Sequence, residues 1–195
     1  MNIVLASASP RRRQLLSEVC SDFSVIVEET DESLPSGTHP KDGVRLLAEK
    51  KGEAVYSKHK NDLQNSIIIS SDTLVELGGV PLGKPGSREE AYLMLRSLSG
   101  KRHNVHTGIA LRIGDRKVSG TATTGVHFRE VSDDEIYEYI DSGEVWDKAG
   151  SYAIQGGAGK FVSKIEGDFD TVVGFSIKLL TELASEIGYA EMFKK

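Results

Sequence analysis

The sequence has a single cysteine, Cys20, in 195 residues. One cysteine forms no internal disulfide, so a reducing, cytoplasmic location is expected. Long apolar runs are also missing, so no membrane-spanning segment is predicted and no membrane partner is expected. A signal peptide is not expected either, because the apolar start at residues 2–6 is too short and is followed by arginines.

The chain has no excess of basic residues, and its formal net charge is −5. Nucleic-acid binding needs a basic face, so no nucleic-acid partner is expected. The sequence has no internal repeat and no low-complexity segment. Its length fits a single domain over residues 1–195, or two lobes that share a sheet.

A buried-strand pattern that ends in polar residues stands at residues 67–73, which read Ile-Ile-Ile-Ser-Ser-Asp-Thr. Three β-branched residues in succession predict a strand buried on both faces. An acid at the end of such a strand, here Asp72, can be presented to a cleft from a rigid backbone. The alternative is that Asp72 only caps a turn, because Ser, Asp and Thr favour turns. This stretch alone favours the turn, and the other motifs change that balance.

A predicted strand at residues 3–6 is followed by a helix start that carries three arginines. Ser9 is a good N-cap and Pro10 suits the first helical position. Residues 11–13 are then arginines in the first turn, where a helix prefers acids. An anion would relieve this repulsion by accepting from backbone N–H groups, serine hydroxyls and guanidinium groups. A solvated basic turn is the alternative; the whole motif favours a phosphate site.

The remaining elements follow from periodicity, capping residues and turn signals. Further strands are predicted at residues 23–27, 74–77, 103–113, 117–129, 161–165 and 171–173, and helices at residues 41–56, 87–98, 176–187 and after Ser132. Strands interleaved with helices and one long hairpin are compatible with an α/β fold. Three histidines fall on strands without the spacing of a metal triad, so we interpret them as surface or hydrogen-bonded residues.

Three loops have compositions that suit ligand binding. The acidic run at residues 28–32 could supply a carboxylate to a hard metal ion, or could simply be solvated. Lys84 stands between turn residues, so a loop presents its ammonium group. Residues 147–157 combine small residues, which let a ligand approach the backbone, with a lysine, a tyrosine and a glutamine. The alternative for this last segment is an ordinary glycine-rich loop.

Together these motifs resemble the Maf family of nucleoside triphosphate pyrophosphatases, also called septum-formation proteins. The matching stretches are residues 5–12, 48–50, 71–73, 83–85, 98–100, 148–156 and 172–174. Each is weak alone, but they run in family order across nearly the whole chain. Two departures are mild: Phe175-Ser176 stands where the family has Leu-Pro, and Ala153 stands where a glycine is usual.

The resemblance implies an α/β fold like that of inosine triphosphate pyrophosphatases. In that fold a mixed, elongated sheet is flanked by helices, and two lobes lie around a cleft. The family often dimerises, so a homodimer is compatible with the resemblance. The implied reaction cleaves a nucleoside triphosphate between the α and β phosphorus, giving the monophosphate and pyrophosphate. The competing hypotheses are a non-enzymatic nucleotide-binding regulator of cell division and, more weakly, a phosphatase that releases orthophosphate.

The charge that develops on phosphoryl oxygens in this reaction calls for cations around an acid. The expected phosphate-binding residues are Ser7, Arg11, Arg12, Lys50 and Lys84. Family resemblance makes Asp72 the proton acceptor. A carboxylate among cations is a poor free base, so we expect a divalent metal, Mg²⁺, to share the work. Glu32 and Glu49 are possible helpers, and no metal ligand is assigned from the sequence.

The resemblance also implies a choice of base. Arg11, Thr73 and Gln155 occupy the specificity positions as in the dTTP and UTP branch of the family, whereas the 7-methylguanosine triphosphate branch carries Trp, Gln and Glu there. The side-chain amide of Gln155 matches the N–H and carbonyl of uracil and thymine, and a glutamate would offer acceptors only. We therefore expect dTTP and UTP as substrates; cytosine stays open, because the amide can flip.

Overall fold

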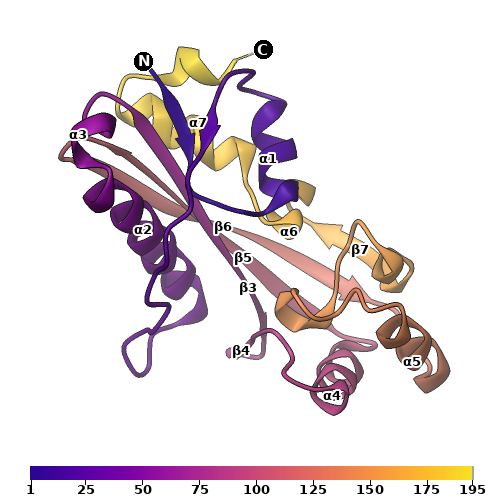
Figure 1. Ribbon diagram of the computed structural model, residues 1–195. Coiled ribbons are helices and arrows are strands. Elements are labelled where there is room, and N and C mark those ends of the chain that lie inside the picture. Colours follow the sequence, from indigo (N-terminus) through magenta and orange to yellow (C-terminus); the bar gives the residue numbers. More distant parts are fainter. Residues whose placement is uncertain (195) are drawn as a thin grey trace. The chain divides into compact units, whose positions relative to one another are not determined.

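The structure is a computed structural model that describes residues 1–194 (Figure 1). The chain divides into two compact units, each assembled from separate segments. The first unit contains Met1–Asp72, Thr107–Ala122 and Gly174–Lys195, and the second contains Thr73–His106 and Thr123–Val173. Among the described residues, no helix combines the length and apolar character needed to cross a membrane.

The strands form one seven-stranded sheet. They are β1 (Ile3–Leu5), β2 (Ser24–Val25), β3 (Ile67–Leu77), β4 (Val80–Leu82), β5 (Arg102–Ile113), β6 (Arg116–Phe128) and β7 (Val162–Glu166). Their order is β2-β1-β3-β5-β6-β7, with β4 paired to β3. Strand β1 is parallel to β2 and β3, whereas β3 with β4 and β6 with β7 are antiparallel pairs. The predicted α/β class with a mixed sheet is confirmed.

The helices flank these strands. The α-helices are α1 (Pro10–Ser17), α2 (Pro40–Lys58), α3 (Lys60–Leu63), α4 (Arg88–Leu98), α5 (Asp133–Asp141), α6 (Phe169–Val173) and α7 (Ile177–Glu186). Short 3-10 helices are η1 (Ala149–Ser151), η2 (Gly157–Phe161) and η3 (Ala190–Phe193).

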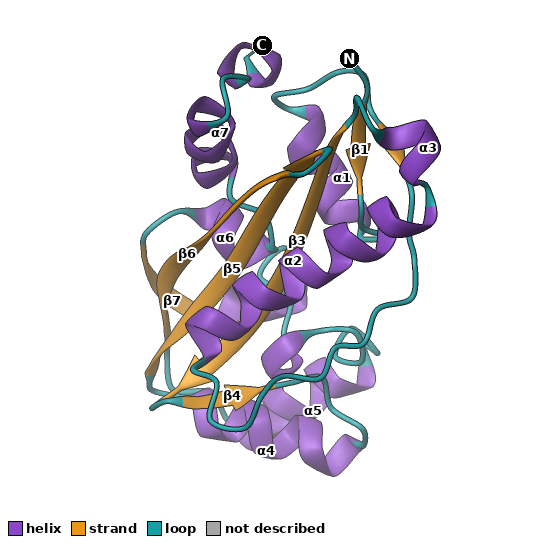
Figure 2. Ribbon diagram, turned by 90° about the vertical axis from the view of Figure 1, so that its left-hand side faces the viewer, coloured by secondary structure: helices purple, strands orange, loops and turns teal. Residues whose placement is uncertain are grey.

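Helices α2 and α7 cover opposite faces of the sheet within the first unit (Figure 2). A Cβ on Gly108 would lie 2.3 Å from the carbonyl oxygen of Val44 in α2, so only glycine fits there. Thr121 donates its hydroxyl to another carbonyl of α2 at 2.9 Å. The preceding residue, Gly120, faces the other way, because its Cβ would meet Leu179 of α7 at 2.9 Å.

Strand β3 runs past its polar residues without a break. Ile67, Ile68 and Ile69 are at most 1% exposed, as expected of a strand buried on both faces. Asp72 lies in the middle of the same strand, which ends only at Leu77. The interpretation of Asp72 as a turn cap is therefore wrong: the ladder of β3 fixes its backbone.

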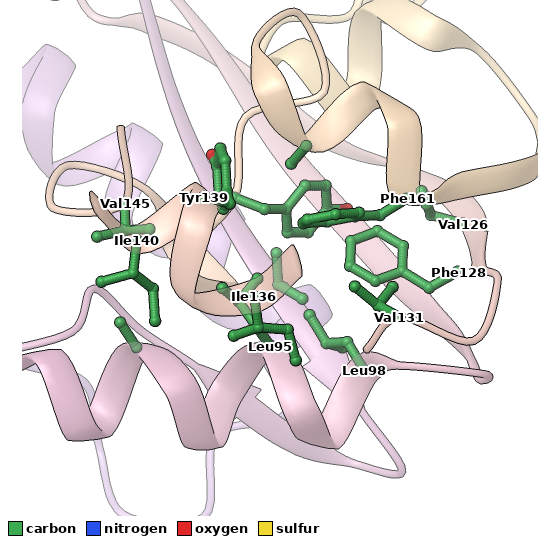
Figure 3. Packing of buried hydrophobic residues seen from close by; sticks show 14 of the residues in the cluster. Leu95, Leu98, Val126, Phe128, Val131, Ile136, Tyr139, Ile140, Val145 and Phe161 are labelled. Atoms are coloured by element: carbon green, nitrogen blue, oxygen red, sulfur yellow. The ribbon is translucent and has the colours of Figure 1, made fainter. Parts of the chain in front are cut away.

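An aromatic cluster holds the core of the second unit together (Figure 3). The ring of Phe161 lies 5.9 Å from that of Phe128 and 5.5 Å from that of Tyr139, both edge to face. Leu95 and Leu98 of α4 belong to the same buried cluster. Burial of each such side chain contributes about 1.5–3 kcal/mol to the free energy of folding, so this cluster stabilises the unit that carries the loops.

One predicted strand is wrong. Residues 171–173 form the last part of helix α6, with Thr171 and Val173 buried. β-branched residues suggested a strand, but in so short a run tertiary packing decides. Asp168, a favoured N-cap type, was the signal for a helix. The Phe175-Ser176 departure is accommodated: Phe175 is fully buried and Ser176 caps α7 by accepting from Leu179 N–H.

Candidate active site

The start of α1 is built as the sequence predicts. Ser9 is the N-cap, and its hydroxyl accepts from the N–H of Arg12 at 3.5 Å. Ser7 Oγ in turn accepts from the N–H of Ser9 at 3.3 Å. The first turn of α1 contains no acid. The positive end of the helix dipole therefore has no acid within its own turn to offset it, which suits an anion.

Arg12 ties three segments of the first unit together. Its Nε donates to the carbonyl of Gly174 at 2.9 Å, and its Nη1 donates to the carbonyl of Ser71 at 2.7 Å and to Ser7 Oγ at 3.3 Å. Burial lowers the pKa of the Arg12 guanidinium, while the charge of Asp72 opposes that shift. Arg12 thus positions the loop of residues 7–9, here called the serine loop, and the part of β3 at Ser71. It also brings positive charge toward Asp72.

Asp72 has a cation beside it that the sequence interpretation did not select. The Nζ of Lys51 in α2 lies 2.6 Å from Asp72 Oδ1 and 2.8 Å from Glu32 Oε1. The side chain of Asp72 is only 13% exposed. Ser7, Arg12, Glu32 and Lys51 all line one cavity of about 280 Å³ in the first unit. A hydroxyl, a guanidinium, an ammonium and a carboxylate thus meet in one hollow.

Lys50, the lysine expected to bind phosphate, points elsewhere. Its Nζ donates to the carbonyls of Ser33 at 2.7 Å and Asp31 at 3.2 Å. Glu49 also lies away from Asp72, because its carboxylate accepts from Arg45 and Ser119. In this structure the ammonium at Asp72 is that of Lys51.

Helical spacing could have identified Lys51. It follows Leu47 by four residues and Ala48 by three, and both of these are buried on the sheet. Residues three and four apart share a helix face, so Lys51 extends the inward stripe and Lys50 lies about 100° away. The resemblance alone left the choice between two adjacent lysines open.

In the second unit, the loop that carries Lys84 is fastened to the glycine-rich segment. The N–H of Gly150 donates to the carbonyl of Gly83 at 2.9 Å. Gly150 has φ +67°, and a Cβ there would lie 3.1 Å from the side chain of Val75. Lys84 is exposed, and within residues 1–194 its ammonium has no hydrogen-bond or ion-pair partner. Its charge is therefore available to a ligand.

Gln155 is exposed at a turn between η1 and η2. The N–H of Gly156 donates to the carbonyl of Ala153 at 3.0 Å and closes the turn. The N–H of Ala153 donates to the hydroxyl of Tyr139, and that of Gly157 to Glu144, each at 3.0 Å. These bonds brace the turn on both sides, so the amide of Gln155 is presented from a fixed backbone.

The predicted site residues thus fall into two groups. Ser7, Arg11, Arg12 and Asp72 belong to the first unit, where the structure adds Lys51 and Glu32. Thr73, Lys84 and Gln155 belong to the second unit. Among residues 1–194 there is no cluster of three or more His, Cys, Asp or Glu side chains that could hold a metal by themselves.

The comparisons with known proteins show the family of this chain. The family model described as Maf-like protein matches residues 2–187, and the chain belongs to this family. A Thermococcus onnurineus protein named dTTP/UTP pyrophosphatase is 44% identical over 97% of this chain and 100% of its own length. A Thermoanaerobacter pseudethanolicus protein of the same name is 46% identical, covering 94% and 95% of the two chains.

A Bdellovibrio bacteriovorus protein, also named dTTP/UTP pyrophosphatase, is 42% identical over 94% of this chain and 97% of its own. Among solved structures, the Staphylococcus aureus Ham1 protein matches 66% of this chain and 72% of its own, with 19% identity and a TM-score of 0.47.

Proposed function

We propose that this protein is a nucleoside triphosphate pyrophosphatase that hydrolyses dTTP and UTP to the monophosphate and pyrophosphate. One observation carries the proposal: Asp72, an acid fixed within a strand, lies 2.6 Å from Lys51. Ser7, Arg12 and Lys51 line the adjacent cavity. Relatives at 42–46% identity are named for this activity.

The chemistry follows from where charge develops. Arg12, Lys51 and the N-terminus of α1 supply the positive charge that stabilises phosphoryl oxygens as the anhydride bond breaks. Asp72 accepts the proton of the attacking water. The strand ladder and Lys51 hold this carboxylate in place, so orientation is fixed before substrate binds.

Asp72 and Glu32 fit a divalent cation. Their carboxylate oxygens converge on one cationic atom, Lys51 Nζ, at 2.6 and 2.8 Å. Mg²⁺ is commonly held by one or two carboxylates, with waters and substrate phosphates completing its shell. These two residues would hold Mg²⁺, which when bound supplies charge neutralisation at the phosphates.

The choice of base is assigned to the second group. Gln155 offers an amide donor and acceptor from its braced turn, and this pair matches uracil and thymine. A base with the wrong pattern leaves polar groups unpaired, so discrimination can be large. Arg11 and Thr73 are proposed to assist it.

The test is to incubate the purified protein with dTTP or UTP and Mg²⁺ and to measure pyrophosphate. Release of pyrophosphate with the monophosphate supports the proposal. A nucleotide-binding regulator would bind without turnover, and a phosphatase would release orthophosphate; either result would overturn the reaction proposed here. Strongest activity on a purine triphosphate would overturn only the base specificity.

A further inference from the structure

A second and larger cavity lies in the first unit, and the proposed reaction does not use it. Its volume is about 1030 Å³, and it is lined by α2, by the loop at residues 29–35 and by the turn-proximal parts of β5 and β6. Leu34, Pro35, Leu46 and Val118 give it apolar walls. Ligand cavities in proteins are commonly of about this size, with mostly apolar walls and a few polar groups.

A mostly buried cation, Arg112, lines the cavity. Arg112 is 8% exposed, and its guanidinium lies 3.7 Å from the ring centre of Tyr56. Its Nη1 donates to Glu53, but within the described chain its buried Nε has no hydrogen-bond partner. An anionic group that enters the cavity would therefore meet a guanidinium whose charge is paired with Glu53.

A second cation stands beside the first. Lys117 also donates to Glu53, so one carboxylate serves both positive charges. The side chain of Glu53 is 44% exposed, and Ser57 is the other residue that holds it, at 2.9 Å. Glu53 therefore occupies the place that the anionic group of a ligand would take, and it can move toward solvent.

We propose that this cavity is a second ligand site, for an organic anion in which a carboxylate or phosphate monoester is attached to an apolar body. The anionic group displaces Glu53 and pairs with Arg112 and Lys117, and the apolar body lies against the walls named above. A carboxylate and a phosphate monoester share this chemistry, because each presents anionic oxygens to the two cations.

The large cavity and the smaller one share part of the loop at residues 29–35. Glu29 and Thr30 line both this cavity and the smaller one that contains Glu32 and Lys51. Lys50 holds the loop from one side through Ser33, and Lys51 contacts it through Glu32. A ligand in the large cavity thus contacts the same loop that supplies Glu32.

The test uses octanoate and phenyl phosphate as probes, with inorganic phosphate and 1-octanol as controls. Binding is followed by calorimetry and by the amide NMR signals of Leu34 and Ser119. We expect at least one of the two organic anions to bind and to shift both signals. Inorganic phosphate, which lacks the apolar body, and 1-octanol, which lacks the anionic group, should each bind at least about tenfold more weakly, because both parts contribute to affinity. If neither organic anion shifts these signals, or if the controls bind equally well, the proposal is wrong.

Two variants test the charges without removing the buried arginine. Lys117→Ala should weaken binding of the organic anion at least about tenfold, because a charge-assisted contact is lost. Glu53→Gln should strengthen it at least about threefold, because the competing carboxylate is gone. The melting temperature of Glu53→Gln should also rise more with ligand than that of the wild type. Equal affinity in all three proteins would overturn the proposal.

A competition experiment separates this site from the proposed catalytic one. A non-hydrolysable α,β-methylene analogue of dTTP at saturation should leave the organic anion bound, because its site lies in the smaller cavity. Displacement by the analogue would place the anion among the phosphate-binding residues and overturn the second site. Binding is measured without turnover, so the outcome does not depend on whether the protein hydrolyses dTTP.

Discussion

Lys50 and Lys51 are neighbours on α2, yet their ammonium groups hold different partners. Lys51 Nζ lies 2.6 Å from Asp72 Oδ1, whereas Lys50 Nζ lies 2.7 Å from the carbonyl oxygen of Ser33. The pair therefore forms a matched experiment. Lys51→Ala should reduce kcat/KM by about 10²-fold or more, because it removes charge beside the reacting phosphates.

Lys50→Ala removes the same kind of charge one position away, so its loss of kcat/KM should stay within about tenfold, as for a partly exposed contact. Initial rates of dTTP hydrolysis at saturating Mg²⁺ measure the loss in each of the two lysine variants. A larger loss at Lys50 than at Lys51 would restore the assignment made from the sequence.

Asp72→Asn should abolish turnover while nucleotide still binds. The amide keeps the shape of the side chain but loses the negative charge and the basicity. Pyrophosphate release and calorimetric titration with the α,β-methylene analogue measure the two properties separately. Near-normal turnover in a folded variant would exclude Asp72 as proton acceptor and as metal ligand.

Replacement of Arg12 and replacement of Lys84 should differ in their effects on activity and on thermal stability. The guanidinium of Arg12 donates to Gly174, Ser71 and Ser7 within the first unit, so Arg12→Ala should lower both activity and the melting temperature. The carbonyls of Ser71 and Gly174 would each lose a hydrogen bond from a charged donor, a contact that contributes about 1.5–3 kcal/mol, although Gly174 keeps the hydroxyl of Ser71.

Lys84→Ala should lower activity alone, because its exposed ammonium has no bonding partner within residues 1–194. Thermal melting beside steady-state kinetics separates the two effects. Early melting of Lys84→Ala with normal kinetics would show a structural role instead.

Gln155→Glu should lose activity on dTTP and UTP far more than it loses stability. The carboxylate cannot donate to a base carbonyl, and the side chain of Gln155 is itself exposed, so the exchange disturbs little packing. Rates over a panel of nucleoside triphosphates give the answer. Unchanged preference for dTTP and UTP would remove Gln155 from base recognition.

The stability of the second unit should depend on the protonation of His103. Burial, with smaller effects of His127 and Arg102, lowers the pKa of His103 from 6.5 to about 4. The unfolded chain therefore takes up a proton at higher pH than the folded one. The stabilising contribution is complete above pH 6.5 and is lost as the pH falls toward about 4.

Urea unfolding from pH 7.5 to 4.5 would show this loss, and His103→Gln should flatten the curve. An identical slope in the variant would assign the effect to other groups. Tyr152, whose hydroxyl lies 2.8 Å from His103 Nε2, helps to hold the ring in the buried site.

The sequence predicted most elements because local signals and burial agree in them. The N-cap at Ser9 forms as expected, and so does the helix after Ser132, where Ser132 and Glu135 make a capping box. The errors lie where local signals are weak. Residues 171–173 are too few for periodicity to distinguish a helix from a strand.

The contacts within the candidate site could not be predicted from the sequence. The loop that supplies Glu32 is irregular, so its approach to Lys51 depends on long-range packing that no local pattern encodes. The buried partners of Arg12, which include the carbonyl of Gly174 far along the chain, depend on packing in the same way. No sequence pattern indicated the second cavity, because residues far apart in the chain, including Arg112, line it together.

The chain crosses from one unit to the other four times, and three of these crossings lie within β3, β5 and β6. No contiguous gene fragment therefore encodes either unit. Arg12 and Ser71 are synthesised long before Gly174, whose carbonyl both of them need. Proteins tend to fold from the N-terminus during synthesis. Here the proposed phosphate-binding serine loop acquires its final support only when the C-terminal segment has left the ribosome.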